Sequence, residues 1–316
     1  MKLKKPKFWD LKRPKLISYL LLPLTIPVRI NNLLLKYWSI EKTDKIKLIC
    51  VGNIYLGGTG KTPATIKMFN ICKKLNLNVS TGKKFRSNQL DEEIILRNKT
   101  NLICEKTRKK ILEKAIKNNF EVVIFDDGLQ DRNINYDLKI VCFDSENWIG
   151  NGYLIPSGPL REKVDSLKKY DIVFLKGECL NEEKIVNFIK DQNPEIKVFQ
   201  TYYEAVNLNK FNVKDDYLIF SGIGNPNNFR NTLIKNSFNV VDEIIFPDHY
   251  EYKQEDIDKI KFKAKKLDAK IITTEKDYVK LTQEDANNIE FLEIDLKIKN
   301  EEDLINFINP IINEKY

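Results

Sequence analysis

The chain has 316 residues, of which 42% are hydrophobic and 31% charged, and its net charge is +8. This length exceeds one small core and suits two α/β domains, and the composition excludes a largely disordered chain. Because the basic residues are spread along the whole sequence, the charge does not indicate a nucleic-acid partner.

The first forty residues form a basic and apolar segment. Seven Lys and Arg residues occur among the first fifteen, and an apolar stretch from Leu16 to Val28 follows, interrupted by Pro23 and Pro27; a second apolar patch follows at 33–35. The stretch is shorter than the roughly 20 residues of a spanning helix, and no cleavage site of a signal peptide follows it. We predict an interfacial membrane anchor, with a helix packed on the protein itself as the alternative.

From Lys45 onward, strand and helix patterns alternate along the chain. This alternation predicts mainly parallel sheets that helices cover on both faces. The expected class is therefore an α/β, P-loop NTPase-like fold with two α/β/α domains and an N-terminal membrane-associated helical segment. The expected boundaries are 1–40 for the segment, 41–205 for the P-loop domain and 206–316 for a smaller α/β domain that closes over the nucleotide. The predicted strands are 47–51, 78–81, 102–105, 121–125, 138–143, 172–175, 217–221, 240–246, 270–274 and 289–294.

Five cysteines occur, an odd number, and no two have the C-x-x-C spacing. This pattern argues against a disulfide framework or a zinc site. Most of them lie in apolar runs, where a free cysteine behaves as a small buried hydrophobe, and this fits a reducing compartment. They are Cys50, Cys72, Cys104, Cys142 and Cys179.

The most specific motif is the string L-G-G-T-G-K-T at 56–62, between a predicted strand and a predicted helix. Glycines let successive backbone N–H groups face phosphate oxygens, and the helix N-terminus adds partial positive charge. Lys61 places a cation on the β- and γ-phosphates, and Thr62 offers a hydroxyl to Mg²⁺. The usual motif has a further glycine where Tyr55 stands. The predicted ATP site comprises Leu56, Gly57, Gly58, Thr59, Gly60, Lys61 and Thr62; the alternative is a Gly-rich turn without a ligand.

Two acidic residues, Asp126 and Asp127, follow the very apolar strand at 121–125. Ligands of open α/β sheets bind at the carboxyl ends of the strands, and a carboxylate there can hold Mg²⁺ directly or through water. The alternative is a simple Asp-Gly turn. Because neighbouring side chains of a strand point to opposite faces, we expect the two carboxylates to contact different groups.

The chain has a single histidine, His249, in the string F-P-D-H-Y. A solitary histidine is more often structural than catalytic. This one lies in a predicted loop, however, and an imidazole there can pair with a carboxylate to activate a hydroxyl.

Several strings occurring in one order resemble the tetraacyldisaccharide 4′-kinases, the lipid A 4′-kinases of Gram-negative bacteria. The resemblance covers nearly the whole chain. The strings are G-N-I-Y-L-G-G-T-G-K-T-P from Gly52, D-D-G-L-Q from Asp126, G-N-G-Y-L-I-P-S-G-P-L-R-E from Gly150, S-G-I-G-N-P from Ser221, F-P-D-H-Y from Phe246 and T-T-E-K-D from Thr273.

The resemblance implies roles for particular residues. Asp91 would be the catalytic base working with His249, and Lys61 completes the catalytic set. Asp127 and Glu162 would join Thr62 in binding Mg²⁺, and Arg161 would face phosphate. Asp126 and Gln130 are further candidates for support of the site. The chain departs from the family pattern at three positions, Thr81, Leu90 and Asp131, and Lys83 or Lys84 is a candidate to replace the charge of the arginine expected at Thr81.

The resemblance also implies the reaction. It is the ATP- and Mg²⁺-dependent phosphorylation of the 4′-hydroxyl of a tetraacylated glucosamine disaccharide 1-phosphate, a lipid A precursor. It implies a place at the cytoplasmic face of the bacterial inner membrane, and a monomer is expected. Three alternatives stay open: a membrane-associated P-loop switch ATPase without a lipid acceptor, a non-catalytic membrane-binding module, and a soluble small-molecule kinase.

Overall fold

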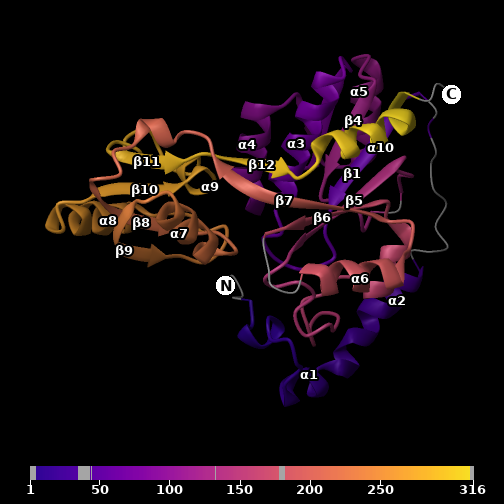
Figure 1. Cartoon of the computed structure of the whole chain (residues 1–316), viewed down its shortest axis with the longest axis horizontal. Helices are drawn as coiled ribbons and strands as arrows, with labels where there is room; N and C mark the ends of the chain where they lie inside the picture. The colour runs from indigo at the N-terminus through magenta and orange to yellow at the C-terminus, as the bar shows by residue number, and fades with distance from the viewer. Residues whose placement is uncertain (1–4, 35–42, 44, 132, 178–181, 314–316) are drawn as a thin grey trace. The chain divides into compact units, whose positions relative to one another are not determined.

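A computed structural model describes residues 5–34, 43, 45–131, 133–177 and 182–313 of the chain. The predicted patch at 33–35 therefore lies partly outside the described residues, and Cys179 lies wholly outside them. The chain forms two compact units (Figure 1). Unit 1 contains residues 1–85, 100–202 and 296–316, and unit 2 contains residues 86–99 and 203–295.

Unit 1 is built on an eight-stranded sheet with the order β12-β7-β6-β5-β1-β4-β2-β3. From β7 to β3 the neighbouring strands are parallel. The strands are β1 (Lys47–Gly52), β2 (Val79–Lys84), β3 (Leu102–Glu105), β4 (Val122–Asp126), β5 (Leu138–Asp144), β6 (Ile172–Lys176), β7 (Lys197–Ala205) and β12 (Ile294–Ile298). The helices are α3 (Lys61–Lys74), α5 (Arg108–Lys117), α6 (Glu182–Gln192) and α10 (Glu301–Asn313), with a 3₁₀ turn at Val164–Lys169.

Strand β1 lies at the centre of this sheet, between β4 and β5, and all six of its residues are buried. Its apolar side chains pack into the main core of the unit together with those of β4 and β5. Because β1 is followed by the glycine-rich loop and β4 ends in Asp126, the carboxyl ends of these two neighbouring strands form one edge. Ligands bind at this edge in open parallel sheets.

Unit 2 has a four-stranded sheet with the order β11-β10-β8-β9, and its neighbouring strands are parallel. The strands are β8 (Asp216–Ser221), β9 (Asn239–Ile245), β10 (Lys270–Thr274) and β11 (Ile289–Leu292). The helices are α4 (Leu90–Lys99), α7 (Pro226–Lys235), α8 (Gln254–Lys266) and the short α9 (Glu275–Tyr278). Along β8, Tyr217 and Ile219 pack into one core cluster and Leu218 and Phe220 into another, so both faces of the sheet are covered. The predicted α/β class with mainly parallel sheets is confirmed.

Two segments belong to a unit that lies far from them in sequence. Helix α4 comes from the N-terminal half of the chain but packs in unit 2, where Lys99 forms ion pairs of 2.8 Å with both Glu275 and Glu293. Helix α10 ends the chain but belongs to unit 1, where Glu301 pairs with Lys67 and Lys74. A division by sequence position alone does not show these exchanges.

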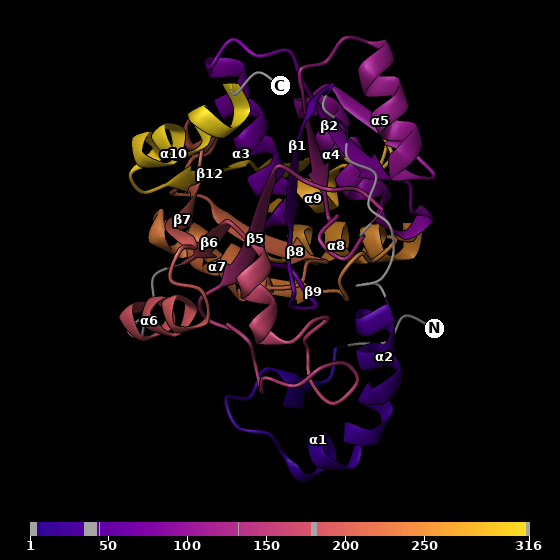
Figure 2. The same cartoon turned by 90° about the vertical axis from the view of Figure 1, so that its right-hand side faces the viewer.

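The N-terminal segment forms short helices that pack on unit 1. They are η1 (Lys7–Trp9), α1 (Leu16–Leu20), η2 (Leu22–Thr25) and α2 (Ile26–Leu34). The Trp9 indole donates to the Pro156 carbonyl at 3.0 Å, and Asn151 donates to the Ser18 hydroxyl at 3.0 Å. Figure 2 shows α1 and α2 beside the segment of unit 1 that runs from β5 to β6. Among the described residues, no helix combines the length and apolar character that a membrane crossing needs.

Candidate active site

The glycine-rich loop leads from β1 into α3, which begins at Lys61. Gly60 caps this helix with a φ of +84°, in the left-handed region that favours glycine. The amide of Asn53 donates to the Gly57 carbonyl at 3.3 Å and to the Thr59 hydroxyl at 2.8 Å. Asn53 is fully buried and thus fixes the loop from inside, a role that the sequence prediction missed. The structure therefore places Lys61 and Thr62 in the first turn of a helix, as a P-loop requires.

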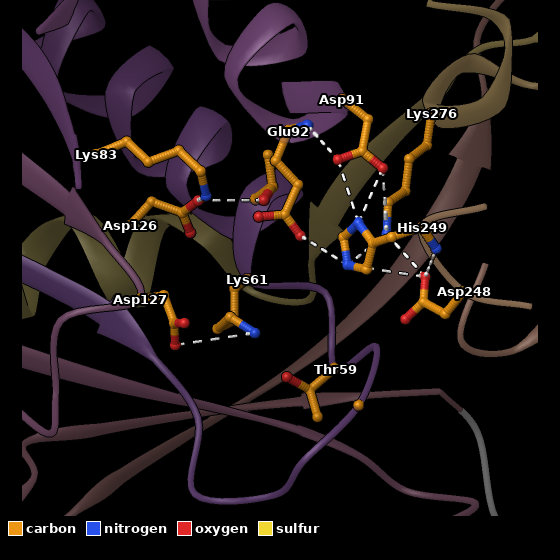
Figure 3. Close-up of polar contacts among 12 residues, drawn as sticks. Thr59, Lys61, Lys83, Asp91, Glu92, Asp126, Asp127, Asp248, His249 and Lys276 are labelled. Atoms are coloured by element: carbon orange, nitrogen blue, oxygen red, sulfur yellow. Dashed lines mark hydrogen bonds and ion pairs between the residues drawn. The ribbon is translucent and has the colours of Figure 1, made fainter. Parts of the chain in front are cut away.

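The Asp126 carboxylate lies at the end of β4 and contacts the start of α3. It accepts hydrogen bonds from the hydroxyls of Thr62 at 3.3 Å and Thr65 at 3.5 Å. It also forms an ion pair of 2.7 Å with Lys83, whose side chain is only 3% exposed (Figure 3). Lys83, which the sequence offered as a replacement for a missing arginine charge, thus sits directly on this carboxylate.

The Asp127 carboxylate contacts a different set of groups. Its backbone has a φ of +57°, and its carboxylate pairs with Arg161 at 2.9 Å and with Lys61 at 3.9 Å. The Arg161 guanidinium also donates to the Gln130 amide oxygen at 3.3 Å. The expectation that the two adjacent acids contact different groups agrees with these contacts.

Glu162 belongs to the same network through Gln130. The Gln130 amide donates to the Glu162 carboxylate at 3.0 Å and to the Asn53 carbonyl at 2.9 Å, and the Tyr170 hydroxyl donates to Glu162 at 3.0 Å. Burial is the main cause that raises the pKa of Tyr170 well above its usual value, and the Glu162 charge adds to it. Tyr170 therefore remains a hydrogen-bond donor to this carboxylate.

The residues of unit 1 fit a magnesium ion that is bound together with a nucleotide. Mg²⁺ prefers oxygen ligands and usually keeps several waters, so it needs only one or two protein groups besides phosphate. The Thr62 hydroxyl and the Asp126 carboxylate, which are in contact, provide such a pair. The described residues contain no group of three or more Asp, Glu, His or Cys that forms a complete metal cage. The sequence named Thr62, Asp127 and Glu162 for this role with Asp126 as a supporting candidate, and of these carboxylates it is Asp126 that contacts the Thr62 hydroxyl.

Three of the residues that depart from the usual P-loop or family patterns have structural partners. Tyr55, at the position where the usual P-loop has glycine, is 2% exposed and packs with Leu154 and Leu160. The Thr81 hydroxyl shares a hydrogen bond of 2.6 Å with Thr100, which joins β2 to the segment before β3. Asp131 forms an ion pair of 2.6 Å with the buried Arg108. These side chains support the unit.

A second cluster of charged residues lies within unit 2, around Asp91 and His249. Asp91 is in the first turn of α4, and its carboxylate lies 3.0 and 3.2 Å from Nδ1 of His249. His249 lies in the predicted loop, with a φ of +55°, and its backbone N–H donates to the Gly222 carbonyl at 3.2 Å. The structure therefore brings together two residues that are 158 positions apart in sequence.

Two ammonium groups also face Asp91: Lys276 at 3.8 Å and Lys280 at 3.6 Å. Burial of Asp91 raises the pKa of its carboxyl, but the hydrogen bond from His249 and the charges of the two lysines outweigh burial and hold the pKa well below its usual value. Asp91 is therefore ionised at neutral pH. The sequence prediction missed both lysines, although Lys276 lies in the string T-T-E-K-D that carried the family resemblance.

Comparison with known proteins identifies close relatives over the whole chain. A family model described as Tetraacyldisaccharide-1-P 4'-kinase matches residues 17–82 and 78–313. A tetraacyldisaccharide 4'-kinase of Pelagibacter ubique is 47% identical over 320 residues, with 100% of both chains covered. One of Rickettsia bellii is 35% identical over 318 residues, covering 95% of this chain and 96% of the relative.

A solved structure has the same fold. It is LpxK from Aquifex aeolicus in complex with ATP, with a TM-score of 0.71 and 22% sequence identity. The match covers 94% of this chain and 100% of that one. At this identity the likeness is evidence for the fold alone.

Proposed function

Since the chain belongs to the tetraacyldisaccharide 4′-kinase family, we propose that it transfers the γ-phosphate of ATP to the 4′-hydroxyl of a tetraacylated glucosamine disaccharide 1-phosphate. The observation that supports this proposal is that one chain contains both a phosphate-binding loop and a candidate proton acceptor. Unit 1 holds a P-loop with Lys61 and Thr62, and unit 2 holds a buried carboxylate paired with an imidazole. A kinase that uses an alcohol acceptor needs both a phosphate site and a proton acceptor.

The residues of unit 1 would bind and orient the nucleotide. The backbone N–H groups of residues 57–62 and the ammonium of Lys61 neutralise phosphate charge, and Arg161 adds a second cation. Thr62 and Asp126, with Asp127 and Glu162 nearby in the network, would hold Mg²⁺. That ion, when bound, neutralises charge on the phosphate oxygens as transfer proceeds.

The residues of unit 2 would act on the acceptor. Asp91 would accept the proton of the sugar 4′-hydroxyl, so that the hydroxyl oxygen bonds to the γ-phosphorus as the bond to ADP breaks. His249 orients the Asp91 carboxylate through the contact at Nδ1. General-base catalysis of this kind contributes about 10²- to 10⁴-fold in rate.

An acceptor-dependence assay separates this function from that of a switch ATPase. Purified protein, radiolabelled ATP and the detergent-dispersed lipid disaccharide should give labelled lipid, with little ADP formed when the lipid is omitted. Asp91→Asn should lower lipid labelling about 10²- to 10⁴-fold, whereas Asp258→Asn, on the exposed face of α8, should leave it unchanged. Equal ADP production with and without lipid would support the switch ATPase instead.

We further propose that the N-terminal helices dock on the cytoplasmic face of the inner membrane. Several large apolar side chains there are exposed to solvent, among them Leu16 (77%), Leu20 (71%) and Leu24 (59%). Exposed basic residues accompany them: Lys12, Arg13, Lys15 and Arg29. Apolar side chains that enter the headgroup boundary beside cations bind anionic lipid surfaces. The same segment packs on unit 1, so the two predicted roles of the N-terminus are compatible.

Sedimentation with anionic vesicles tests this docking. The variant Leu16→Ser/Leu20→Ser/Leu24→Ser should lose most of its vesicle binding, because each exposed leucine that enters the membrane contributes about 1.5–3 kcal/mol. Phe262→Ser is the matched control, since Phe262 is 69% exposed but lies on α8 in unit 2. If both variants bind as the parent does, the N-terminal helices are not the docking surface.

A further inference from the structure

Lys276 makes three contacts around the pair formed by Asp91 and His249, all within unit 2. Its ammonium lies 3.0 Å from the Asp248 carboxylate, 3.3 Å from Nε2 of His249 and 3.8 Å from the Asp91 carboxylate (Figure 3). Its side chain is 22% exposed. Burial lowers the pKa of Lys276, but the charges of Asp248, Glu92 and Asp91 outweigh burial and raise that pKa above its usual value. The amine is therefore a cation at neutral pH.

These contacts determine which ring nitrogen of His249 carries the proton. An ammonium group has three hydrogen-bond donors and no acceptor. Nε2 must therefore accept the bond from Lys276, and a nitrogen that accepts has no proton. The ring proton of the neutral imidazole is then on Nδ1, where it donates to the Asp91 carboxylate at 3.0 Å.

The ammonium of Lys276 also opposes the addition of a second proton to the His249 ring, because that proton would make the ring positive. Charged groups that face His249 in the described part of the chain include Asp91 and Glu92 from α4, Asp248 from its own loop, and Lys276 from α9. The three carboxylates attract positive charge to the ring, and the ammonium of Lys276, 3.3 Å from Nε2, opposes it. This matters for Asp91, because an imidazolium at 3.0 Å would hold its carboxylate in the unprotonated form more strongly than an ammonium at 3.8 Å.

We propose that Lys276 is a positioning residue of the reaction, which holds His249 as the neutral Nδ1–H tautomer and so keeps Asp91 able to accept a proton. The catalytic half of this statement rests on the proposed kinase function, whereas the tautomer is a property of the protein alone. Lys280 provides a matched control. It comes from the same part of the chain and lies 3.6 Å from Asp91, but its ammonium pairs more closely with Asp277, at 2.8 Å.

The tautomer can be measured directly because His249 is the single histidine of the chain. Full-length protein labelled with ¹⁵N-histidine gives one pair of ring nitrogen signals, and their shifts identify the tautomer without resonance assignment. The parent should show the Nδ1–H form at pH 7. Lys276→Met should lose the pure Nδ1–H signature at pH 7, because no ammonium then donates to Nε2. Lys280→Met should keep the spectrum of the parent.

Lys276→Gln separates hydrogen bonding from charge, and it also serves if the methionine variant does not fold. Its amide can still donate to Nε2, so the Nδ1–H form should persist. An Nε2–H tautomer or an imidazolium in the parent at pH 7 would overturn the proposal. A Lys276→Met spectrum identical to that of the parent would overturn it as well.

Kinetics test the catalytic half. Lys276→Met should lower kcat about ten- to a hundredfold at pH 7 and leave the KM for ATP unchanged. If the tautomer is as expected but no lipid is labelled even by the parent, the proposed kinase function fails and the tautomer assignment stands. If the parent labels lipid and Lys276→Met matches its kcat, Lys276 is not a positioning residue.

Discussion

Lys83 and Asp126 form a deeply buried ion pair at the sheet edge where β1 and β4 end. Lys83→Met should therefore destabilise unit 1. The ammonium and the carboxylate are 2.7 Å apart, with side chains that are 3% and 0% exposed. After the substitution, Asp126 keeps only the hydroxyl contacts of Thr62 and Thr65, at 3.3 and 3.5 Å. Two long, neutral hydrogen bonds cannot replace a cation beside a carboxylate that is fully buried.

The magnitude follows from this geometry. Removing one partner of a buried ion pair costs about 3–5 kcal/mol, because the other charge stays buried without compensation. With a urea dependence of about 2–3 kcal/mol per molar, the midpoint of unfolding should fall by about 1–2.5 M. Lys83→Met/Asp126→Asn removes both charges and should recover most of this loss. Lys84→Met, on the exposed side of the same strand, should change stability by less than about 0.5 kcal/mol.

Tryptophan fluorescence is a suitable probe, because all three tryptophans, Trp9, Trp38 and Trp148, belong to the sequence ranges of unit 1. Adding MgCl₂ should stabilise Lys83→Met more than the parent, since the metal can compensate Asp126 when the lysine is absent. The reasoning is refuted if Lys83→Met unfolds within about 1 kcal/mol of the parent, or if the double variant is less stable than the single one.

Three further predictions concern other parts of unit 1. Lys61→Met should lower kcat at least about 10³-fold while the urea midpoint stays near that of the parent, because Lys61 is needed to stabilise phosphate charge; a variant with near-normal kcat would contradict the phosphate role. A thiol reagent should not modify Cys50, Cys72 and Cys142 of the folded protein at pH 8. Burial raises the pKa of each thiol to about 12, so only about 10⁻⁴ of each is thiolate. Rapid labelling of these cysteines would contradict the prediction. Asp131→Asn should destabilise the protein at pH 7. Burial raises the pKa of Asp131, but Arg108 and Asn133 outweigh burial and lower that pKa below its usual value, so the carboxylate stabilises the fold above about pH 4 and this stabilisation disappears as the pH falls. A stability difference from the parent that persists at pH 2 would show another origin.

The P-loop domain could be predicted from sequence because its signals are local. The apolar strand, the glycines and the helix start of residues 47–75 occur in one continuous stretch, and the structure has them as β1, the loop and α3. The carboxyl end of β4 was predicted in the same way. Side chains such as Asn53 and Lys83 were harder to assign, since each acts through a contact with a residue of another segment.

The packing of α4 in unit 2, unlike the P-loop, could not be predicted from local sequence signals. Its ten residues carry two buried apolar side chains, Ile95 and Leu96, and no long amphipathic pattern indicates which core they join. The ion pairs of Lys99 with Glu275 and Glu293 connect the helix to residues that occur nearly two hundred positions later. Contacts across such distances depend on the complete fold, so they cannot be derived from local pattern.

The inclusion of α4 in unit 2 explains how the pair of Asp91 and His249 is assembled from distant segments. Asp91 reaches His249 only because α4 leaves the sequence range of unit 1 at residue 86 and the chain returns to it at residue 100. Lys99 fixes the end of the helix opposite Asp91 to the first residue of α9, and the next residue of α9 is Lys276. One ion pair therefore connects the helix that carries the carboxylate to the helix that carries the cation. If this connection positions both groups, Lys99→Met should lower kcat and weaken the Nδ1–H signature of His249 together. A change in only one of them would show that the two groups are positioned independently.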